Sequence, residues 1–204
     1  MNVIENRGGG VDRRVLAEAV EALREGKIVL YPTDTLYALG CNALDARAIE
    51  RLCRIKGLNP DKNTLSIVCS DLSQAAEYAR IDNKAFRLLK HYLPGAFTFI
   101  LPASTTLPKV FKGRKCVGVR IPDCEFARAL AEELGNPVLT TSADAEDEDE
   151  LRSAESLALL YQGQSDIVLA VDNGEGSATP STVVDVTDSS APEIVREGAG
   201  IFED

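Results

Sequence analysis

Hydroxyl and cationic side chains at predicted strand ends and loops form the set most able to do chemistry in this sequence. The set is Thr33, Thr35, Lys56, Asn63, Arg120, Ser142, Ser181 and Arg196. It contains no covalent nucleophile, but nucleotidyl transfer needs none, because catalysis there rests on positioning and on stabilising charge at phosphate oxygens. The set therefore suits a nucleoside triphosphate with magnesium. Each residue alone also has a structural explanation, such as a turn, a strand start or a surface charge.

The sequence lacks the residues of several other reaction classes. It has no G-x-x-x-x-G-K-(S/T) phosphate loop, and no glycine cluster stands between a strand and a helix, as a dinucleotide fingerprint requires. The one histidine, His91, falls in the last turn of a predicted helix, which disfavours a Ser-His-Asp hydrolase and a histidine zinc site. The acids around Asp147 could hold a divalent cation, but we expect a solvated loop there and predict no metal ligand.

The first residues of the set follow a short predicted strand. Residues 28–31 are β-branched, aliphatic and aromatic, and the strand ends at Pro32 because proline donates no ladder hydrogen bond. Ligands of α/β proteins bind outside the carboxyl edge of the sheet, where Thr35 would lie. Asp45 then caps a helix that ends at Lys56. We therefore expect Thr35 and Lys56 to face one crevice.

Strands and helices alternate along the rest of the chain. Further strands are predicted at residues 65–69, 97–101, 115–121, 137–141, 167–171, 181–186 and 193–196. Other helices are predicted to begin at Asp12, Asp71, Asp82, Asp123 and Ser153. This order predicts an α/β fold with flanking helices, and the adjacent terminal strands favour a mixed sheet over a purely parallel one.

The length and composition are typical of one soluble domain. The 204 residues can bury a continuous core, so we predict a domain over residues 11–200 and no second domain. Five widely spaced cysteines fit neither a disulfide framework nor a zinc ribbon, and indicate buried thiols in a reducing cytoplasm. No run approaches the ~20 apolar residues that cross a bilayer, so we expect a cytoplasmic protein that does not enter a membrane.

The net charge of −10 disfavours non-specific nucleic-acid binding by the molecule as a whole. The distribution is uneven, because basic residues concentrate in 47–62 and 108–120 while residues 144–150 are mostly acidic. On charge alone these segments are the solvated sides of helices and a loop. If the basic segments line one face, however, that face could attract phosphate. RNA binding there would be weak, shape-selective and steeply salt-dependent.

Motifs along most of the chain resemble the YrdC/YciO family. They are PTDTLYALG (32–40), Lys56-Gly57, LPGAFTFIL (93–101), VGVRIP (117–122), TSA (141–143), STVVD (181–185) and REG (196–198). They stand in the family's order and approximate spacing, over about residues 11–200. The lack of a full K-x-R motif and the run NPDKN (59–63) are more similar to the YciO branch than to YrdC. The resemblance implies a YrdC-like domain whose twisted mixed sheet has a concave nucleotide- and RNA-binding groove.

The resemblance also implies a reaction and roles for residues. YrdC-like proteins condense L-threonine, bicarbonate and ATP into L-threonylcarbamoyl-adenylate with release of pyrophosphate, toward N6-threonylcarbamoyladenosine in tRNA. Carried over by motif, Thr35, Arg120 and Ser181 would hold threonine, and Lys56 and Arg120 would be catalytic. ATP, accompanied by Mg²⁺, would be held by Lys56, Asn63, Ser142, Asp144 and Arg196. The family's groove is also associated with double-stranded RNA, which makes RNA or tRNA a further expected partner.

Three positions depart from the family pattern. Leu58 stands where K-x-R has arginine, Asp144 where S-x-N has asparagine, and Val68 where a histidine is expected after a strand. A leucine cannot bond phosphate, and a carboxylate beside a polyphosphate costs Coulomb energy. Two hypotheses stay open: a threonylcarbamoyl-adenylate synthase of altered efficiency, or a YciO-like protein that binds an adenylate, another nucleotide or RNA with little synthase activity. A groove that binds a protein partner is a third alternative.

Overall fold

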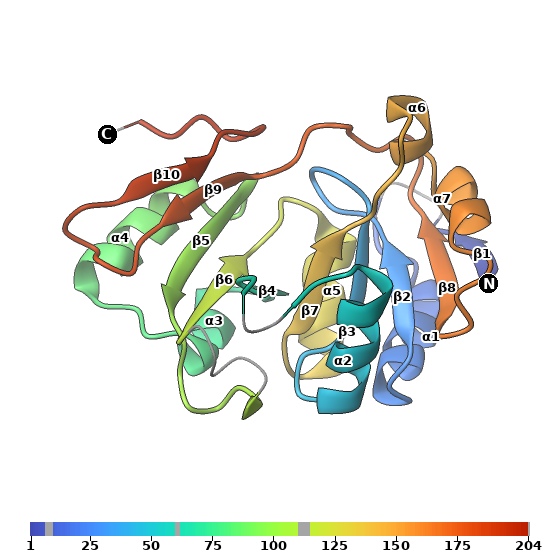
Figure 1. Cartoon of the computed structure of the whole chain (residues 1–204), viewed down its shortest axis with the longest axis horizontal. Coiled ribbons are helices and arrows are strands. Elements are labelled where there is room, and N and C mark those ends of the chain that lie inside the picture. Colours follow the sequence, from blue (N-terminus) through green and yellow to red (C-terminus); the bar gives the residue numbers. More distant parts are fainter. Residues whose placement is uncertain (7–9, 60–61, 110–114, 204) are drawn as a thin grey trace.

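One mixed sheet runs through the whole molecule. The computed structural model describes residues 1–6, 10–59, 62–109 and 115–203. Within these residues the sheet has ten strands in the order β1-β8-β2-β3-β7-β4-β6-β5-β9-β10, with parallel and antiparallel pairs. Figure 1 shows the chain ends near opposite ends of this sheet. The predicted mixed α/β fold is confirmed.

Most elements lie where the sequence predicts them. The strands are β1 Asn2–Glu5, β2 Ile28–Tyr31, β3 Ala38–Asn42, β4 Ser66–Val68, β5 Phe97–Pro102, β6 Cys116–Arg120, β7 Val138–Ser142, β8 Ile167–Asp172, β9 Thr182–Asp185 and β10 Glu193–Arg196. The helices are α1 Arg13–Arg24, α2 Ala46–Ile55, α3 Leu72–Tyr78, α4 Asn83–Tyr92, α5 Glu125–Leu134, α6 Glu148–Leu151 and α7 Ala154–Leu160. No described helix combines the length and apolar composition needed to cross a membrane.

Two predictions about elements are wrong. Helix α5 begins at Glu125 rather than at Asp123, and Cys124 at its N-cap makes no side-chain capping hydrogen bond. The acidic run expected as a loop contains the single helical turn α6, capped by Asp147. The hydroxyls expected at the carboxyl end of a strand do end one, as residues 140–142 of β7, which pairs with β3.

Two strands were absent from the prediction. β3 contains Ala38, Gly40 and Asn42, which are residue types depleted in strands. Its own residues therefore do not predict a strand. It forms because residues 32–37 turn the chain back, pairing β3 with β2 on one side and with β7 on the other. β1 lies before residue 11 and pairs in parallel with β8, at one edge of the sheet.

Helices cover both faces of the sheet, but one face only in part. Helices α2, α3 and α4 bury apolar side chains against one face, in a cluster that includes Ile49, Leu89 and Phe99. The sheet twists, so in Figure 1 α2 lies in front of β3 whereas α4 lies behind β9 and β10. On the other face, α1 and α5 pack over β2, β3, β8 and β4. Beyond them, that second face carries polar side chains and is open.

Gly40 in the motif run is required by packing. It lies in β3 between β2 and β7, and a Cβ there would come within 2.6 Å of Val138 Cγ1 and 2.7 Å of Tyr31 Cε1. Both neighbours are fully buried, so they have little room to move.

We predict that Gly40→Ala lowers the free energy of unfolding by about 1–3 kcal/mol through overpacking. Chemical denaturation with matched m-values measures the change. Gly163→Ala is the control, because a Cβ at Gly163 meets no atom within 4 Å. Equal effects of the two substitutions would show that Gly40 is not constrained by its neighbours.

Candidate functional site

A pocket of about 260 Å³ opens on the uncovered part of the second sheet face. Hydroxyl and cationic side chains dominate its lining, and they come from β4, β5, β6, β7 and the two C-terminal strands. Those used below are Ser66, Thr98, Arg120, Thr140, Ser181 and Arg196. Gly118 keeps the floor flat, because a Cβ there would overlap Ser66 Oγ and press on Thr98 Cγ2. The pocket is therefore polar, shallow and positively charged.

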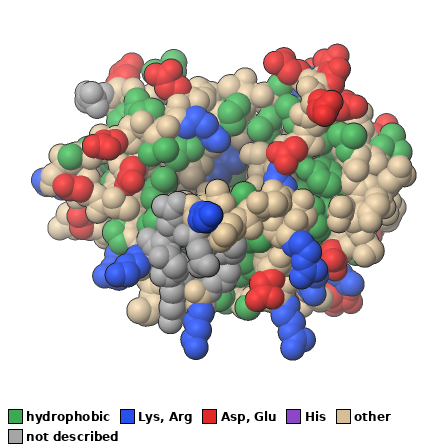
Figure 2. Space-filling model, viewed as in Figure 1, with side chains coloured by type: hydrophobic (Ala, Val, Ile, Leu, Met, Phe, Trp, Pro, Cys, Tyr) green, Lys and Arg blue, Asp and Glu red, His purple; other side chains and the backbone are tan. Residues whose placement is uncertain are grey.

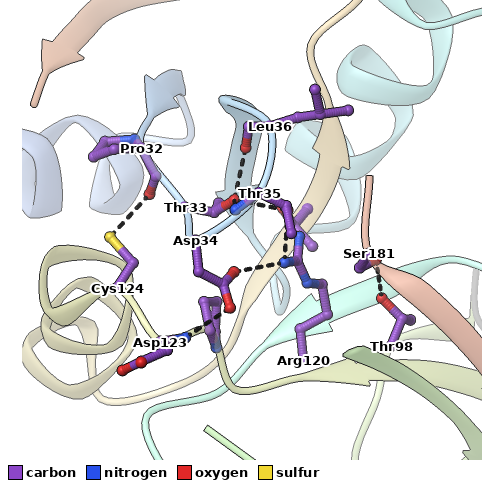
Figure 3. Close-up of polar contacts among 12 residues, drawn as sticks. Pro32, Thr33, Asp34, Thr35, Leu36, Thr98, Arg120, Asp123, Cys124 and Ser181 are labelled. Atoms are coloured by element: carbon purple, nitrogen blue, oxygen red, sulfur yellow. Dashed lines mark hydrogen bonds and ion pairs between the residues drawn. The ribbon is translucent and has the colours of Figure 1, made fainter. Parts of the chain in front are cut away.

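Arg120 is the central cation of the pocket, and it is fixed by a buried ion pair (Figure 3). Its Nη2 lies 2.9 Å from Asp34 Oδ1, and the two side chains are 7% and 9% exposed. The other oxygen of Asp34 accepts from the backbone N–H of Asp123 at 2.9 Å. A carboxylate satisfied on both oxygens holds the guanidinium in one position.

A hydrogen-bond relay through the hairpin loop supports the same guanidinium (Figure 3). Arg120 Nη2 also donates to Thr35 Oγ1 at 3.0 Å, and the Thr33 hydroxyl donates to the Leu36 carbonyl at 2.6 Å. Thr33 has then used its one proton, so in the 3.1 Å contact between the two threonines Thr35 is the donor. Thr35 was expected to bind a ligand directly through its hydroxyl. The residue is only 2% exposed, and its hydroxyl instead positions Arg120.

One donor of Arg120 has no hydrogen-bond partner. Its Nε is buried and meets no acceptor among the described residues, although Arg120 lines the pocket. A buried donor without a partner costs about 1–3 kcal/mol. A ligand in the pocket can reach only the exposed 7% of the Arg120 side chain, not the enclosed Nε.

Arg196 brings a second guanidinium to the pocket wall. Its Nη2 donates to the Ser181 carbonyl at 2.7 Å, and Ser181 Oγ lies 2.9 Å from Thr98 Oγ1. Burial lowers the pKa of Arg196, and the positive charge of Arg120 adds to that shift. Both guanidinium groups line the same pocket, as a polyanion or carboxylate site requires.

Lys56 is engaged differently from the prediction. Its Nζ donates to the Ser142 carbonyl at 2.6 Å and forms an ion pair with Asp144. The lysine side chain is 6% exposed and the aspartate 73%, and the backbone N–H of Asp144 donates to Tyr161 Oη at 2.9 Å. Lys56 and Thr35 thus do not line the pocket themselves. Lys56 contacts the lining residue Ser142, and Thr35 contacts the lining residue Arg120.

The structure brings most of the other predicted residues to the pocket. Asn63, Ser142, Ser181 and Arg196 line it, although Asn63 is exposed and its Oδ1 accepts from the Asn59 N–H at 3.0 Å. The binding roles given to these side chains stay predictions.

Two of the departing positions differ in their surroundings. Leu58 follows α2 in a loop, lines the pocket and packs, partly buried, against the first core cluster. Val68 ends β4 and is buried in the second cluster.

Sequence reasoning missed Ser66, Thr98 and Thr140 in the pocket. Ser66 and Thr98 are polar residues next to buried apolar residues in β4 and β5. A polar residue beside a buried one in a strand indicates that the opposite sheet face is open. Thr140 also accepts a buried 2.7 Å hydrogen bond from Tyr31 Oη, which anchors the pocket wall to β2. Burial raises the pKa of Tyr31, so this hydroxyl stays protonated and remains a donor.

The predicted RNA-binding charges are only partly described. Arg47, Arg54, Lys62 and Lys109 are exposed, whereas residues 110–114 of the second basic segment fall outside the described residues. Figure 2 shows acidic side chains gathered over α6 and Lys and Arg side chains projecting from the opposite edge of that view. RNA binding stays a prediction.

Comparison with known proteins places the chain in a family. The Sua5/YciO/YrdC family model, described as telomere recombination, matches residues 21–198. The chain belongs to this family. YciO of Escherichia coli strain K12, itself uncharacterised, is 40% identical over 190 residues, which are 92% of this chain and 91% of YciO. The threonylcarbamoyl-AMP synthase of Pyrococcus abyssi is 34% identical over 97% of this chain but 58% of its own length.

Solved structures agree with this placement. The crystal structure of E. coli YciO has a TM-score of 0.86 and 38% identity, covering 98% of this chain and 95% of YciO. P. abyssi Sua5 complexed with L-threonine also has a TM-score of 0.86, with 34% identity, covering 97% of this chain and 58% of Sua5. The higher identity to YciO confirms the predicted similarity to that branch.

The buried pair between Asp34 and Arg120 generates a stability prediction. Asp34→Ala leaves a buried guanidinium without its counter-ion, so the free energy of unfolding should fall by about 3–5 kcal/mol. Urea unfolding measures it. The control is Asp123→Ala, which keeps the backbone donor to Asp34. It loses only the 3.5 Å ion pair between Arg128 and the Asp123 side chain, which is 75% exposed. That loss should be at most about 1 kcal/mol, and similar losses for both variants would contradict the assigned role of Asp34.

Proposed function

We propose that this protein binds an adenine nucleotide in the pocket around Arg120 and carries out nucleotidyl transfer of the threonylcarbamoyl-AMP synthase type. The reaction joins L-threonine, bicarbonate and ATP into L-threonylcarbamoyl-AMP, with release of pyrophosphate and water, in the pathway to N6-threonylcarbamoyladenosine of tRNA. Support comes from synthases among the relatives, including one from Bacillus subtilis that is 35% identical over 90% of this chain and 53% of its own length. A homologous fold also appears in complex with L-threonine.

The observation that carries the proposal is the pair of guanidinium groups, Arg120 and Arg196, that line one hydroxyl-rich pocket. Guanidinium donors recognise carboxylate and phosphate oxygens, and the pair with Asp34 fixes Arg120 before the ligand arrives. Thr35 positions Arg120, and Ser181 lies on the same wall with its hydroxyl bonded to Thr98. These residues form the proposed threonine side.

The nucleotide side would be formed mainly by the opposite wall, where Asn63 and Ser142 line the pocket, Lys56 lies directly behind Ser142, and Asp144 pairs with the lysine. Arg196 would reach the nucleotide from the Ser181 wall, to which its guanidinium is bonded. No group of three or more His, Cys, Asp or Glu side chains in the described parts of the chain could hold a metal ion. Magnesium would therefore come bound to the phosphates, where it neutralises charge. The chain's own residues would orient the ligand and stabilise phosphoryl charge.

The pair between Lys56 and Asp144 also favours a second candidate function. Together with Leu58 it removes two cationic contacts from the phosphate side, which suits a YciO-like protein acting on a different substrate with little synthase activity. The pyrophosphate and adenylate formed from ATP, threonine and bicarbonate would separate the two candidates.

Calorimetric titration with AMP and ATP tests the shared binding step. Arg196→Ala should weaken binding by about 10-fold, because it removes a charge-assisted contact. Arg13→Ala, on an exposed turn of α1, changes net charge equally and should leave the affinity unchanged. Absence of binding by the native protein at millimolar nucleotide would contradict the proposed function.

Restoring the family residues tests the synthase assignment. Leu58→Arg with Asp144→Asn adds a cation and removes an anion at the phosphate side, which should raise adenylate formation by roughly 30- to 1000-fold. The arginine stem can replace part of the leucine's packing, and the thermal midpoint of the variant checks this. A folded variant that binds ATP without a gain in product would favour the different-substrate candidate.

A further inference from the structure

The pocket's cations are mostly compensated by the chain's own carboxylates. Arg120 is paired with Asp34, and Lys56 with Asp144. Arg196 has no acidic partner among the described residues, and its guanidinium donates to the Ser181 carbonyl and hydroxyl. Three cations less two carboxylates leave a net charge of +1 at the pocket and its bonded neighbours.

This charge balance fits a ligand of low negative charge. A phosphate monoester carries about −1.5 to −2 at neutral pH, and each further phosphoryl group adds about one more negative charge. The two carboxylates paired with the pocket's cations therefore penalise a triphosphate more than a monophosphate or an adenylate.

Asp144 is the carboxylate that can make this distinction. Asp34 is buried and structural, whereas Asp144 is 73% exposed and is bound to the lysine nearest the Ser142 wall. A phosphate at that wall reaches Lys56 only in competition with the carboxylate. Because Asp144 is solvated and near the surface, it can rotate away, so the pair lowers affinity without closing the pocket.

We infer that Asp144, through its ion pair with Lys56, is a specificity determinant that biases the pocket toward a nucleoside monophosphate or adenylate and against a nucleoside triphosphate. The inference rests on the proposed nucleotide binding. It explains how a chain with the family's fold can keep the pocket while losing affinity for one reactant.

The test is calorimetric titration of AMP and ATP, in magnesium-free buffer, into the native protein and Asp144→Asn. The native protein should bind ATP no more tightly than AMP. In Asp144→Asn the affinity for ATP should rise by about 10-fold and that for AMP by less than about 3-fold, because the released ammonium gains a charge-assisted contact with the added phosphates.

Two further variants make the result specific. Glu146→Gln removes an exposed negative charge two residues away that has no ion pair with a pocket cation among the described residues, so it should change neither affinity by more than about 2-fold. Asp144→Asn combined with Lys56→Met should lose the gain for ATP, as a coupled pair requires. Circular dichroism verifies that each variant is folded.

The outcomes separate the inference from the proposed function. A native preference for ATP, an equal rise for both nucleotides in Asp144→Asn, or a gain that survives Lys56→Met would overturn the inference alone. Absence of binding of either nucleotide by every variant would overturn the proposed nucleotide site and the inference with it.

Discussion

The buried ion pair between Arg120 and Asp34 holds the site together. β6 carries the arginine, and the aspartate lies in the hairpin loop between β2 and β3. In the sheet, β7 and β4 lie between that hairpin and β6. The same carboxylate fixes the chain before α5 through the N–H of Asp123. Such a pair is weak evidence for net stability, because desolvation offsets attraction. Its value here is geometric, since it gives a pocket formed from six strands one fixed cation.

Local chemistry made much of the fold predictable. Aspartates at positions 12, 45, 71 and 82 each accept hydrogen bonds from the first turn of a helix, so those starts could be found from single residues. Asp123 carries the same signal, but its carboxylate pairs with Arg128, and the helix begins at Glu125 without a side-chain cap. β3 is held by partners that lie far away in sequence, and its own residues give no strand signal.

The site was predictable in its residues but not in their connections. Arg120, Ser142, Ser181 and Arg196 could be found because they stand in motifs that resemble the family's, and all four line the pocket. Which carboxylate meets which cation depends on strand register, since Asp34 and Arg120 are 86 positions apart. Lys56 and Ser142 are equally distant in sequence. Proximity in sequence therefore could not show that Thr35 supports a cation rather than facing a ligand.

Within the region that this chain shares with its relatives, the fold does not distinguish YciO from Sua5. The structure superposes equally well on YciO and on a Sua5 bound to threonine, with a TM-score of 0.86 in each case, although it covers only 58% of Sua5. At Leu58 and Asp144 this chain departs in charge from the family's motifs, and charge in a partly desolvated pocket acts strongly. A single exposed carboxylate beside a buried lysine, as with Asp144 and Lys56, can lower affinity for a highly charged substrate while the backbone stays unchanged. The pocket thus preserves its shape while its electrostatics decide which reactants it admits.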